Sequence, residues 1–323
     1  MIYFYLFCFL FLVISGYFRL AEHFNIIDKP NQRSSHTLIT IRGGGVIFYF
    51  AALFYFFWSG YRYPFFFIGL SLMAFVSFLD DIYTLSNKLR IVVHLISVAF
   101  LLHQLDFFQQ SWPLILVAAF VIIGVINAYN FMDGINGITA AYSFVIIWLL
   151  WLANEHYDFI DDQLLYFLAI GNLVFFYFNF RNKAKCFAGD VGSVSMSFIL
   201  IYALFLLIIK AANPIYLLFL SVYGIDVVTT IGIRLLKREN IFKAHRMHLY
   251  QYLGNEAGLN RLMIAFFYSS VQLFIGFFII WIAGFSVVHQ LLFSVFLLLI
   301  LASGYATLRW YVYRKYVQPG IKN

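Results

Sequence analysis

The stretch FFFIGLSLMAFVSFLDDIYTLSNKLR, residues 65–90, passes from an uncharged apolar run directly into two adjacent aspartates, Asp80 and Asp81. A carboxylate within or beside hydrocarbon is costly, so one that persists there usually holds a cation, a substrate or another side chain. The stretch therefore predicts a membrane-spanning helix with a candidate functional site at its end.

The rest of the chain is equally apolar. Its 323 residues are 63% hydrophobic and 11% charged, which excludes a soluble domain and a single membrane anchor. Segments that approach or reach the roughly 20 residues of a membrane span are centred near Leu10, Phe50, Leu72, Ser97, Val117, Ile146, Ile170, Leu200, Leu220, Leu273 and Leu298. We expect an all-α, polytopic integral membrane protein of about 11 transmembrane helices, forming one domain over residues 1–323.

The basic residues predict how the chain crosses the membrane. If the helices alternate, 19 of the 21 Lys and Arg lie on one set of loops, and only Arg62 and Lys210 lie on the other. The positive-inside rule then places the N-terminus outside and the C-terminus in the cytoplasm. The net charge of +7 is spread along these cytoplasmic loops, which favours lipid headgroups and phosphate substrates over nucleic acid as partners.

Five polar segments interrupt the apolar background, and all five fall on the predicted cytoplasmic side. In chain order they are DKPNQRSSHTLITIRGGG (28–45), DDIYTLSNKLR (80–90), NAYNFMDGING (127–137), FAGDVGSVS (187–195) and FKAHRMHLYQ (242–251). We call them the first to fifth polar segments. Their coincidence at one membrane face predicts a site there.

In the second segment, Asp80 and Asp81 would point about 100° apart on a helix, so we expect them to have different roles. One carboxylate can bind a divalent cation while the other orients a neighbouring group. Helix capping would also place an aspartate at a membrane boundary, but normally one and not two.

The third segment spaces Asn127, Asn130, Asp133 and Asn136 three residues apart, which on a helix forms one polar stripe. Amides and a carboxylate can recognise a nucleotide base, a sugar or a hydrated metal. Polar contacts between helices are the alternative.

In the fourth segment, Asp190 lies between Gly189 and Gly192 at the expected start of a span. Backbone N–H groups at a helix start favour phosphate, although an aspartate there can itself cap the helix. With Mg²⁺ present, Asp190 could hold the metal while the amides hold the phosphate.

The first and fifth segments supply cations. These are Lys29, Arg33, His36 and Arg42 in one segment and Lys243, His245, Arg246 and His248 in the other. The glycines after Arg42 would let backbone approach a phosphate. Phosphate contact fits the histidines better than zinc, because no cysteine or third histidine lies nearby. An ordinary basic loop would explain the lysines and arginines alone.

Asp226 stands apart inside an apolar segment, in YGIDVVTTIGIR. An intramembrane carboxylate is a functional candidate, and we expect it to pair with a cationic side chain from the first or fifth segment.

Taken in this order, DKPNxRxxH, DDxxxLxxxxR, NxxNFMDGIxG, GDxGS and HRxHLYQ resemble the motifs of the polyprenyl-phosphate N-acetylhexosamine-1-phosphate transferase family, glycosyltransferase family 4. The resemblance covers nearly the whole chain. It implies transfer of a sugar 1-phosphate from a UDP-N-acetylhexosamine to undecaprenyl phosphate with Mg²⁺ or Mn²⁺, at the cytoplasmic face of a bacterial inner membrane.

The resemblance also implies roles for individual residues. Metal binding falls to Asp80, Asp81 and Asp190, nucleotide contacts to Asn130 and Asp133, and donor phosphates to His245, Arg246 and His248. We add Asn127 and Asn136 to the nucleotide-sugar group, and assign Lys29, Arg33, His36, Arg42 and Arg90 to the lipid phosphate. The catalytic set is Asp80, Asp81, Asp133 and Asp190. The sequence does not decide whether the chain forms a homodimer.

Two departures from the family pattern bear on the sugar. Many members carry an aspartate where this chain has Asn136, which argues against a metal role there. The fifth motif, HRMHLYQ, looks closer to the branch that starts O-antigen or capsule chains, so GlcNAc and a 6-deoxy relative both stay open.

For the reaction, we expect direct attack by the lipid phosphate on the donor, since position and charge stabilisation dominate phosphoryl transfer. A two-step route through an aspartyl-phosphate on Asp80 or Asp81 is the rival. An ion-coupled transporter or flippase is the main alternative function, but that class places its ionisable residues near the bilayer midplane. An inactive scaffold is a third.

Overall fold

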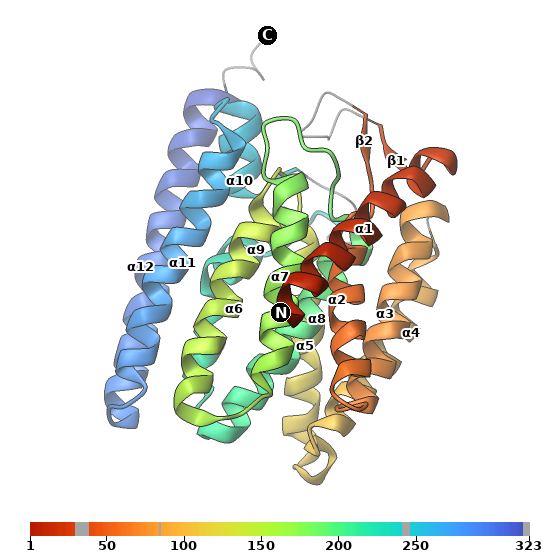
Figure 1. The fold of residues 1–323 in the computed structure, drawn as a ribbon. Coiled ribbons are helices and arrows are strands. Elements are labelled where there is room, and N and C mark those ends of the chain that lie inside the picture. Colours follow the sequence, from red (N-terminus) through yellow and green to blue (C-terminus); the bar gives the residue numbers. More distant parts are fainter. Residues whose placement is uncertain (30–38, 84, 241–245, 319–323) are drawn as a thin grey trace.

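The computed structural model describes residues 1–29, 39–83, 85–240 and 246–318, and its long elements are all helices (Figure 1). The long helices are α1 Ile2–His23, α2 Val46–Trp58, α3 Pro64–Tyr83, α4 Asn87–Gln104, α5 Trp112–Met132, α6 Ile138–Tyr157, α7 Asp162–Asn179, α8 Gly189–Ala211, α9 Ser221–Leu236, α11 Arg261–Ile282 and α12 Val287–Val312. Short elements are β1 Ile27–Asp28, β2 Thr40–Ile41, η1 Phe107–Gln109, η2 Pro214–Leu220, α10 Leu249–Gln251, η3 Tyr252–Glu256 and η4 Tyr313–Val317.

Each of the eleven apolar segments coincides with one of these long helices, the ninth as η2 running into α9. Within the described ranges, 8 helices are long and apolar enough to cross a membrane. Helix α2, with 13 residues, is a shorter apolar helix, and α4 and α7 have 18 residues each. The expected all-α polytopic architecture is confirmed, while the number of crossings stays a prediction.

Helix α8 is the centre of the bundle. It packs against α2, α3, α5 and α6. Of its apolar 18-residue stretch, 83% is buried, whereas the corresponding value is 6% for the span that contains α12. The exposed apolar side chains of α12 suit a lipid environment, where they carry no hydrophobic penalty. The start of α8, which carries the fourth polar segment, is therefore fixed from several sides.

Glycines let α2 approach α8 to backbone contact. A Cβ atom on Gly45 would overlap the Gly192 backbone, and the N–H groups of Gly44 and Gly45 donate to the carbonyls of Phe187 and Ala188 at 2.8 and 3.0 Å. We expected the glycines after Arg42 to admit a phosphate. The structure corrects this expectation, because they admit the chain leading into α8.

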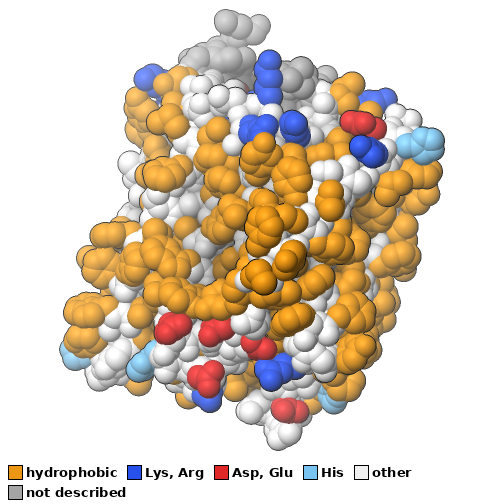
Figure 2. Space-filling model, viewed as in Figure 1, with side chains coloured by type: hydrophobic (Ala, Val, Ile, Leu, Met, Phe, Trp, Pro, Cys, Tyr) orange, Lys and Arg blue, Asp and Glu red, His pale blue; other side chains and the backbone are white. Residues whose placement is uncertain are grey.

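The polar segments gather at one end of the bundle. Figure 1 shows β1, β2, α10 and the C-terminus together at the upper end. β1 and β2 pair antiparallel, and Ile41 bridges to Cys186 just before α8. In Figure 2, Lys and Arg lie mainly toward this end and Asp and Glu mainly toward the other, with a broad apolar surface between them.

Candidate active site

A chain of alternating carboxylates and arginines lies at this end of the bundle. Arg90 Nη1 is 2.8 Å from Asp80 Oδ2, and Arg90 Nη2 is 3.6 Å from Asp190 Oδ2. Arg42 Nη2 is 3.4 Å from the other oxygen of Asp190, and Arg42 Nε is 2.7 Å from Asp81 Oδ1. Residues from α3, α4, α8 and the segment before α2 thus meet in one site.

Asp81 caps the start of α8. Its Oδ1 accepts the backbone N–H of Asp190 at 2.9 Å, and its Oδ2 accepts that of Val191 at 3.0 Å. The side chain is 0% exposed. A carboxylate at a helix N-terminus is stabilised by the free N–H groups and the helix dipole. The amides that we expected to hold a phosphate are therefore already bonded to protein.

Asp80 has different partners. Besides Arg90, it accepts the backbone N–H of Leu85 at 2.6 Å through Oδ1, which closes the chain after α3. The two adjacent aspartates thus face different groups, as their angular separation predicted.

Arg42 remains charged between its two carboxylates. Burial by itself would lower the pKa of Arg42, but Asp81 and Asp190 more than offset this, so its pKa is raised. The three aspartates and two arginines of the site carry one negative charge more than positive when all are ionised. Such a site favours an additional cation.

The described residues include no group of three His, Cys, Asp or Glu side chains placed to hold a metal ion. Of the three carboxylates predicted to bind metal, Asp81 is bonded to the start of α8 and to Arg42. Asp80 and Asp190 share Arg90, and Asp190 has the longer arginine contacts. One or two carboxylates completed by substrate phosphates is a usual Mg²⁺ arrangement, so these two aspartates fit a metal ligand pair.

The third polar segment is only partly helical. Helix α5 ends at Met132, so Asn136 lies beyond the expected stripe. Asn136 is buried, and its Nδ2 donates to the carbonyls of Arg181 and Asn182 at 2.8 and 3.3 Å. It holds the loop between α7 and α8. On α5 itself, Asn127 donates to the Ile123 carbonyl at 2.9 Å, and Asn130 is half-buried.

Asp133 directly follows α5 and belongs to the same region as the carboxylate–arginine chain. Burial raises the pKa of Asp133 to about 6, opposed by the Thr139 hydroxyl, which donates to its Oδ1 at 2.5 Å. Asp190 raises this pKa further and Arg42 lowers it, so both charges act on Asp133. Thr139, which sequence reasoning missed, is six residues downstream beyond two glycines.

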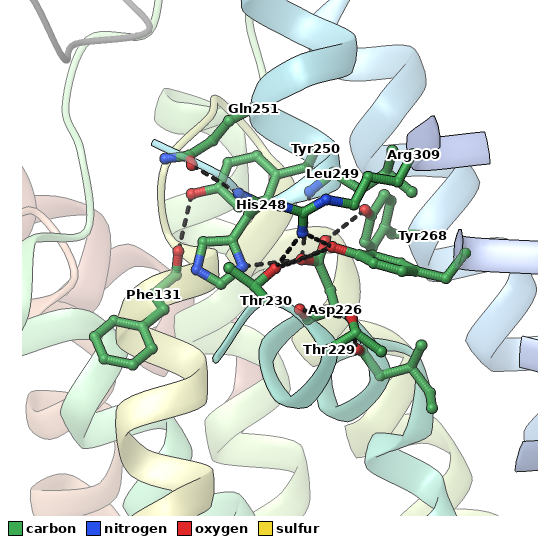
Figure 3. A network of polar contacts seen from close by, with 12 residues as sticks. Phe131, Asp226, Thr229, Thr230, His248, Leu249, Tyr250, Gln251, Tyr268 and Arg309 are labelled. Atoms are coloured by element: carbon green, nitrogen blue, oxygen red, sulfur yellow. Dashed lines mark hydrogen bonds and ion pairs between the residues drawn. The ribbon is translucent and has the colours of Figure 1, made fainter. Parts of the chain in front are cut away.

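The fifth polar segment is bonded to Asp226, and Figure 3 shows the contact. His248 Nδ1 lies 2.9 Å from Asp226 Oδ1, and the backbone N–H of Leu249 donates to the same oxygen at 3.3 Å. We expected Asp226 to pair with a side chain of the first or fifth segment, and the structure shows that the partner is His248 of the fifth segment. His248 itself is only 2% exposed.

Sequence reasoning missed the rest of this cluster. Tyr268 donates to Asp226 Oδ2 at 2.8 Å and Tyr305 donates to Oδ1 at 3.1 Å. Arg309 donates to Tyr305 at 3.0 Å and to Thr230 at 3.1 Å. Tyr305 and Arg309 stand one helical turn apart in the last apolar segment, and that spacing of polar groups was the available signal.

Other predicted residues lie in polar segments near the same end of the bundle or outside the described part of the chain. Lys29 is exposed, and Arg246 Nη2 lies 3.5 Å from Glu256 Oε1 with its side chain 28% exposed. Arg33, His36 and His245 lie outside the described residues.

The sequence matches a family model and several curated proteins. Residues 63–209 match the family model for glycosyl transferase family 4. The chain is 26% identical over 277 residues, 78% of this chain and 75% of the other, to the undecaprenyl-phosphate alpha-N-acetylglucosaminyl 1-phosphate transferase of Yersinia pestis. It is 26% identical to the protein of that name from Escherichia coli (strain K12), over 73% of this chain and 71% of the other. Against the probable undecaprenyl-phosphate N-acetylglucosaminyl 1-phosphate transferase of Bacillus subtilis (strain 168), it is 25% identical, over 73% and 71%.

Proposed function

Because the chain belongs to glycosyl transferase family 4, we propose that it transfers an N-acetylhexosamine 1-phosphate from a UDP-sugar to undecaprenyl phosphate, releasing UMP. The observation that supports this function is the network of ion pairs at one end of the apolar bundle, which joins Asp80, Arg90, Asp190, Arg42 and Asp81. A water-soluble donor and a lipid acceptor could both reach a site at this position.

The charges of the site suit this reaction. A phosphate monoester has a second pKa near 6, so the acceptor phosphate is mostly a dianion at neutral pH. It needs little help from a general base, and the main obstacle is repulsion from the anionic diphosphate of the donor. Arg42 and Arg90, with side chains 35% and 28% exposed, are placed to reduce that repulsion. The first segment would reduce this repulsion further through Lys29, Arg33 and His36.

A divalent cation, Mg²⁺ or Mn²⁺, would be held by Asp190 and Asp80. When bound, it would neutralise charge on the diphosphate and polarise the phosphorus under attack. Asp81 would act through the fold, by holding the backbone of Asp190 and Val191 and by orienting Arg42.

Direct in-line attack by the lipid phosphate is favoured over an aspartyl-phosphate. The two-step route needs Asp80 or Asp81 as nucleophile, but both oxygens of each carboxylate accept from protein groups. Hydrogen bonds and ion pairs to a carboxylate stabilise its negative charge and so make its oxygens weaker nucleophiles. Exchange of labelled UMP into UDP-sugar without a lipid acceptor would contradict the one-step reaction.

The nucleotide-sugar is assigned to the third and fifth segments. Asp133 and Asn130 would accept and donate hydrogen bonds to the nucleotide, with Asn127 on the same helix. Arg246 and His245 would contact the diphosphate. Asn136 and His248 are bonded to other protein groups, so we assign them to positioning the site and not to contacting the donor.

The enzyme would lie in a bacterial inner membrane with this site facing the cytoplasm, as the Lys and Arg distribution favours. GlcNAc or a 6-deoxy relative would be the sugar, and the product would start a surface polysaccharide such as O-antigen or capsule. A homodimer is compatible with this function.

The direct test uses purified protein with undecaprenyl phosphate, Mg²⁺ and a panel of UDP-N-acetylhexosamines that includes 6-deoxy forms, with UMP release as the readout. We expect release with at least one donor, dependent on both the lipid and the metal. Release that does not require the lipid phosphate would contradict the proposed reaction.

A further inference from the structure

Asp226 is a fully buried carboxylate within Pro214–Leu236, a segment long and apolar enough to cross a membrane. An isolated ion in such a place is strongly destabilising unless hydrogen bonds satisfy its oxygens. Here each oxygen is bonded, and the donors come from four separate parts of the chain, namely His248, Leu249, Thr230, Tyr268 and Tyr305. So many hydrogen bonds to one carboxylate indicate that the position of Asp226 is important for the structure around it.

Two of these donors belong to the fifth polar segment, which is not itself a span. Asp226 bonds the ring of His248 and the next backbone N–H, that of Leu249. Gln251 Oε1 accepts the backbone N–H of His248 at 3.2 Å, which starts α10. A carboxylate accepts hydrogen bonds only, so Nδ1 is the protonated ring nitrogen. Nε2 lies on the ring edge that points away from Asp226 (Figure 3).

The same segment is fastened at a second point, next to Asp133. The Tyr250 hydroxyl donates to the Phe131 carbonyl at 2.8 Å, and it lies so close to Gly134 that a Cβ there would overlap it. Phe131 and Gly134 flank Asp133 in sequence. The segment therefore connects Asp226 in α9 to the end of α5.

Helix α12 supplies the opposite charge. Arg309 is 7% exposed, donates to Tyr305 and Thr230, and lies over the Tyr252 ring at 5.4 Å. Both of its hydrogen-bond acceptors are themselves bonded to Asp226. The guanidinium thus offsets the buried carboxylate through two hydroxyl groups.

We propose that Asp226 is a positioning residue that, through His248 Nδ1 and the Leu249 N–H, fixes residues 246–251 beside Asp133. Arg246 and Asp133 are thereby held in one orientation toward the donor. What these residues bind rests on the proposed function, whereas the fixing itself does not. A displacement of about 1 Å in a binding group can reduce a rate about 100-fold, so loosening this contact should impair donor use.

The first test measures backbone hydrogen exchange in a peptide covering residues 246–252, in the full-length protein. Asp226→Asn and Tyr268→Phe should exchange faster there than the wild type. Tyr55→Phe is the matched control, since it also removes one hydroxyl bonded to a carboxylate, Asp161 Oδ2 at 3.0 Å, in the external loop region. If Asp226→Asn fails to fold, Tyr268→Phe decides. Unchanged exchange in the variants that fold would overturn the proposal.

The second test separates positioning from direct donor contact by His248. An asparagine amide can replace Nδ1, while the longer glutamine amide replaces Nε2. We expect His248→Asn to keep the donor KM within about threefold and His248→Gln to raise it about 10-fold or more, with kcat less affected. The reverse order would assign His248 to the donor and overturn its positioning role. If the wild type releases no UMP with any UDP-sugar, the proposed function fails, and hydrogen exchange still decides the fixing of residues 246–251.

Discussion

Asp81 accepts the backbone N–H of Asp190 at 2.9 Å, so the last turn of α3 caps the first turn of α8. The aspartate that looked like a metal ligand is a structural link between two helices. Its neighbour in the site, Asp190, is the carboxylate left with the longer ion pairs.

Asp81→Asn should therefore reduce stability as well as activity. An asparagine can accept only through its one oxygen, and its NH₂ group would face a backbone N–H while Arg42 loses its closest carboxylate. Leaving such buried groups unpaired costs about 1–3 kcal/mol. Thermal unfolding in detergent measures the effect. Asp106→Asn, at an exposed position between α4 and η1, is the control and should leave the melting temperature unchanged.

Asp190→Asn should separate activity from stability. Its two ion pairs are 3.4 and 3.6 Å long and its side chain is 17% exposed, so its loss should change the melting temperature little. Because Asp190 is a proposed metal ligand, the Asp190→Asn substitution should raise the Mg²⁺ concentration for half-maximal UMP release by more than about 10-fold. An unchanged Mg²⁺ titration would exclude Asp190 as a ligand.

Asp133 should make donor binding pH-dependent. Burial raises the pKa of Asp133 to about 6, so a carboxylate that accepts hydrogen bonds from the donor is lost as the pH falls through this value. The donor KM should rise below about pH 6 and level off above it.

Two variants check the origin of that inflection. Thr139→Val removes the hydroxyl that lowers this pKa, so the inflection should move to higher pH, and Asp133→Asn should abolish it. For stability, the folded pKa lies above the ordinary value of 3.8, so the contribution of Asp133 is greatest in acid and is lost as the pH rises through about 6. An inflection that persists in Asp133→Asn would assign it to another group.

Gly45→Ala should disrupt the bundle near the site. The added methyl would overlap the Gly192 backbone, and overpacking of this kind costs about 1–3 kcal/mol. We expect a lower melting temperature and less UMP release. Gly124→Ala is the matched control, because a Cβ there meets nothing within 4 Å and helix propensity favours alanine by about 1 kcal/mol.

The helices could be predicted from the sequence because they depend on local properties. A run of apolar residues near bilayer length must satisfy its own backbone hydrogen bonds, and a helix does so within the segment. All eleven apolar segments are accordingly helical. The candidate site could be located to one end of the bundle for a similar reason, since charged residues gather where the chain leaves the membrane.

The partners of individual atoms could not be predicted in this way. The two residues of the Asp81–Asp190 bond are 109 positions apart, and those of the Tyr305–Asp226 bond are 79 apart. Asn136 continued a three-residue spacing, yet α5 ends before it and its amide bonds to the loop at Arg181.

The sequence by itself determined the helical membrane architecture, the gathering of the polar segments and the types of group available for phosphate chemistry. Only the tertiary structure decided that Asp81 caps α8, that Asp190 has the longer ion pairs, and that Asp226 bonds to His248 and Leu249. The physical reason is that hydropathy and helix formation act over neighbouring residues, whereas each carboxylate oxygen is satisfied by whichever donor the packed bundle brings within about 3 Å.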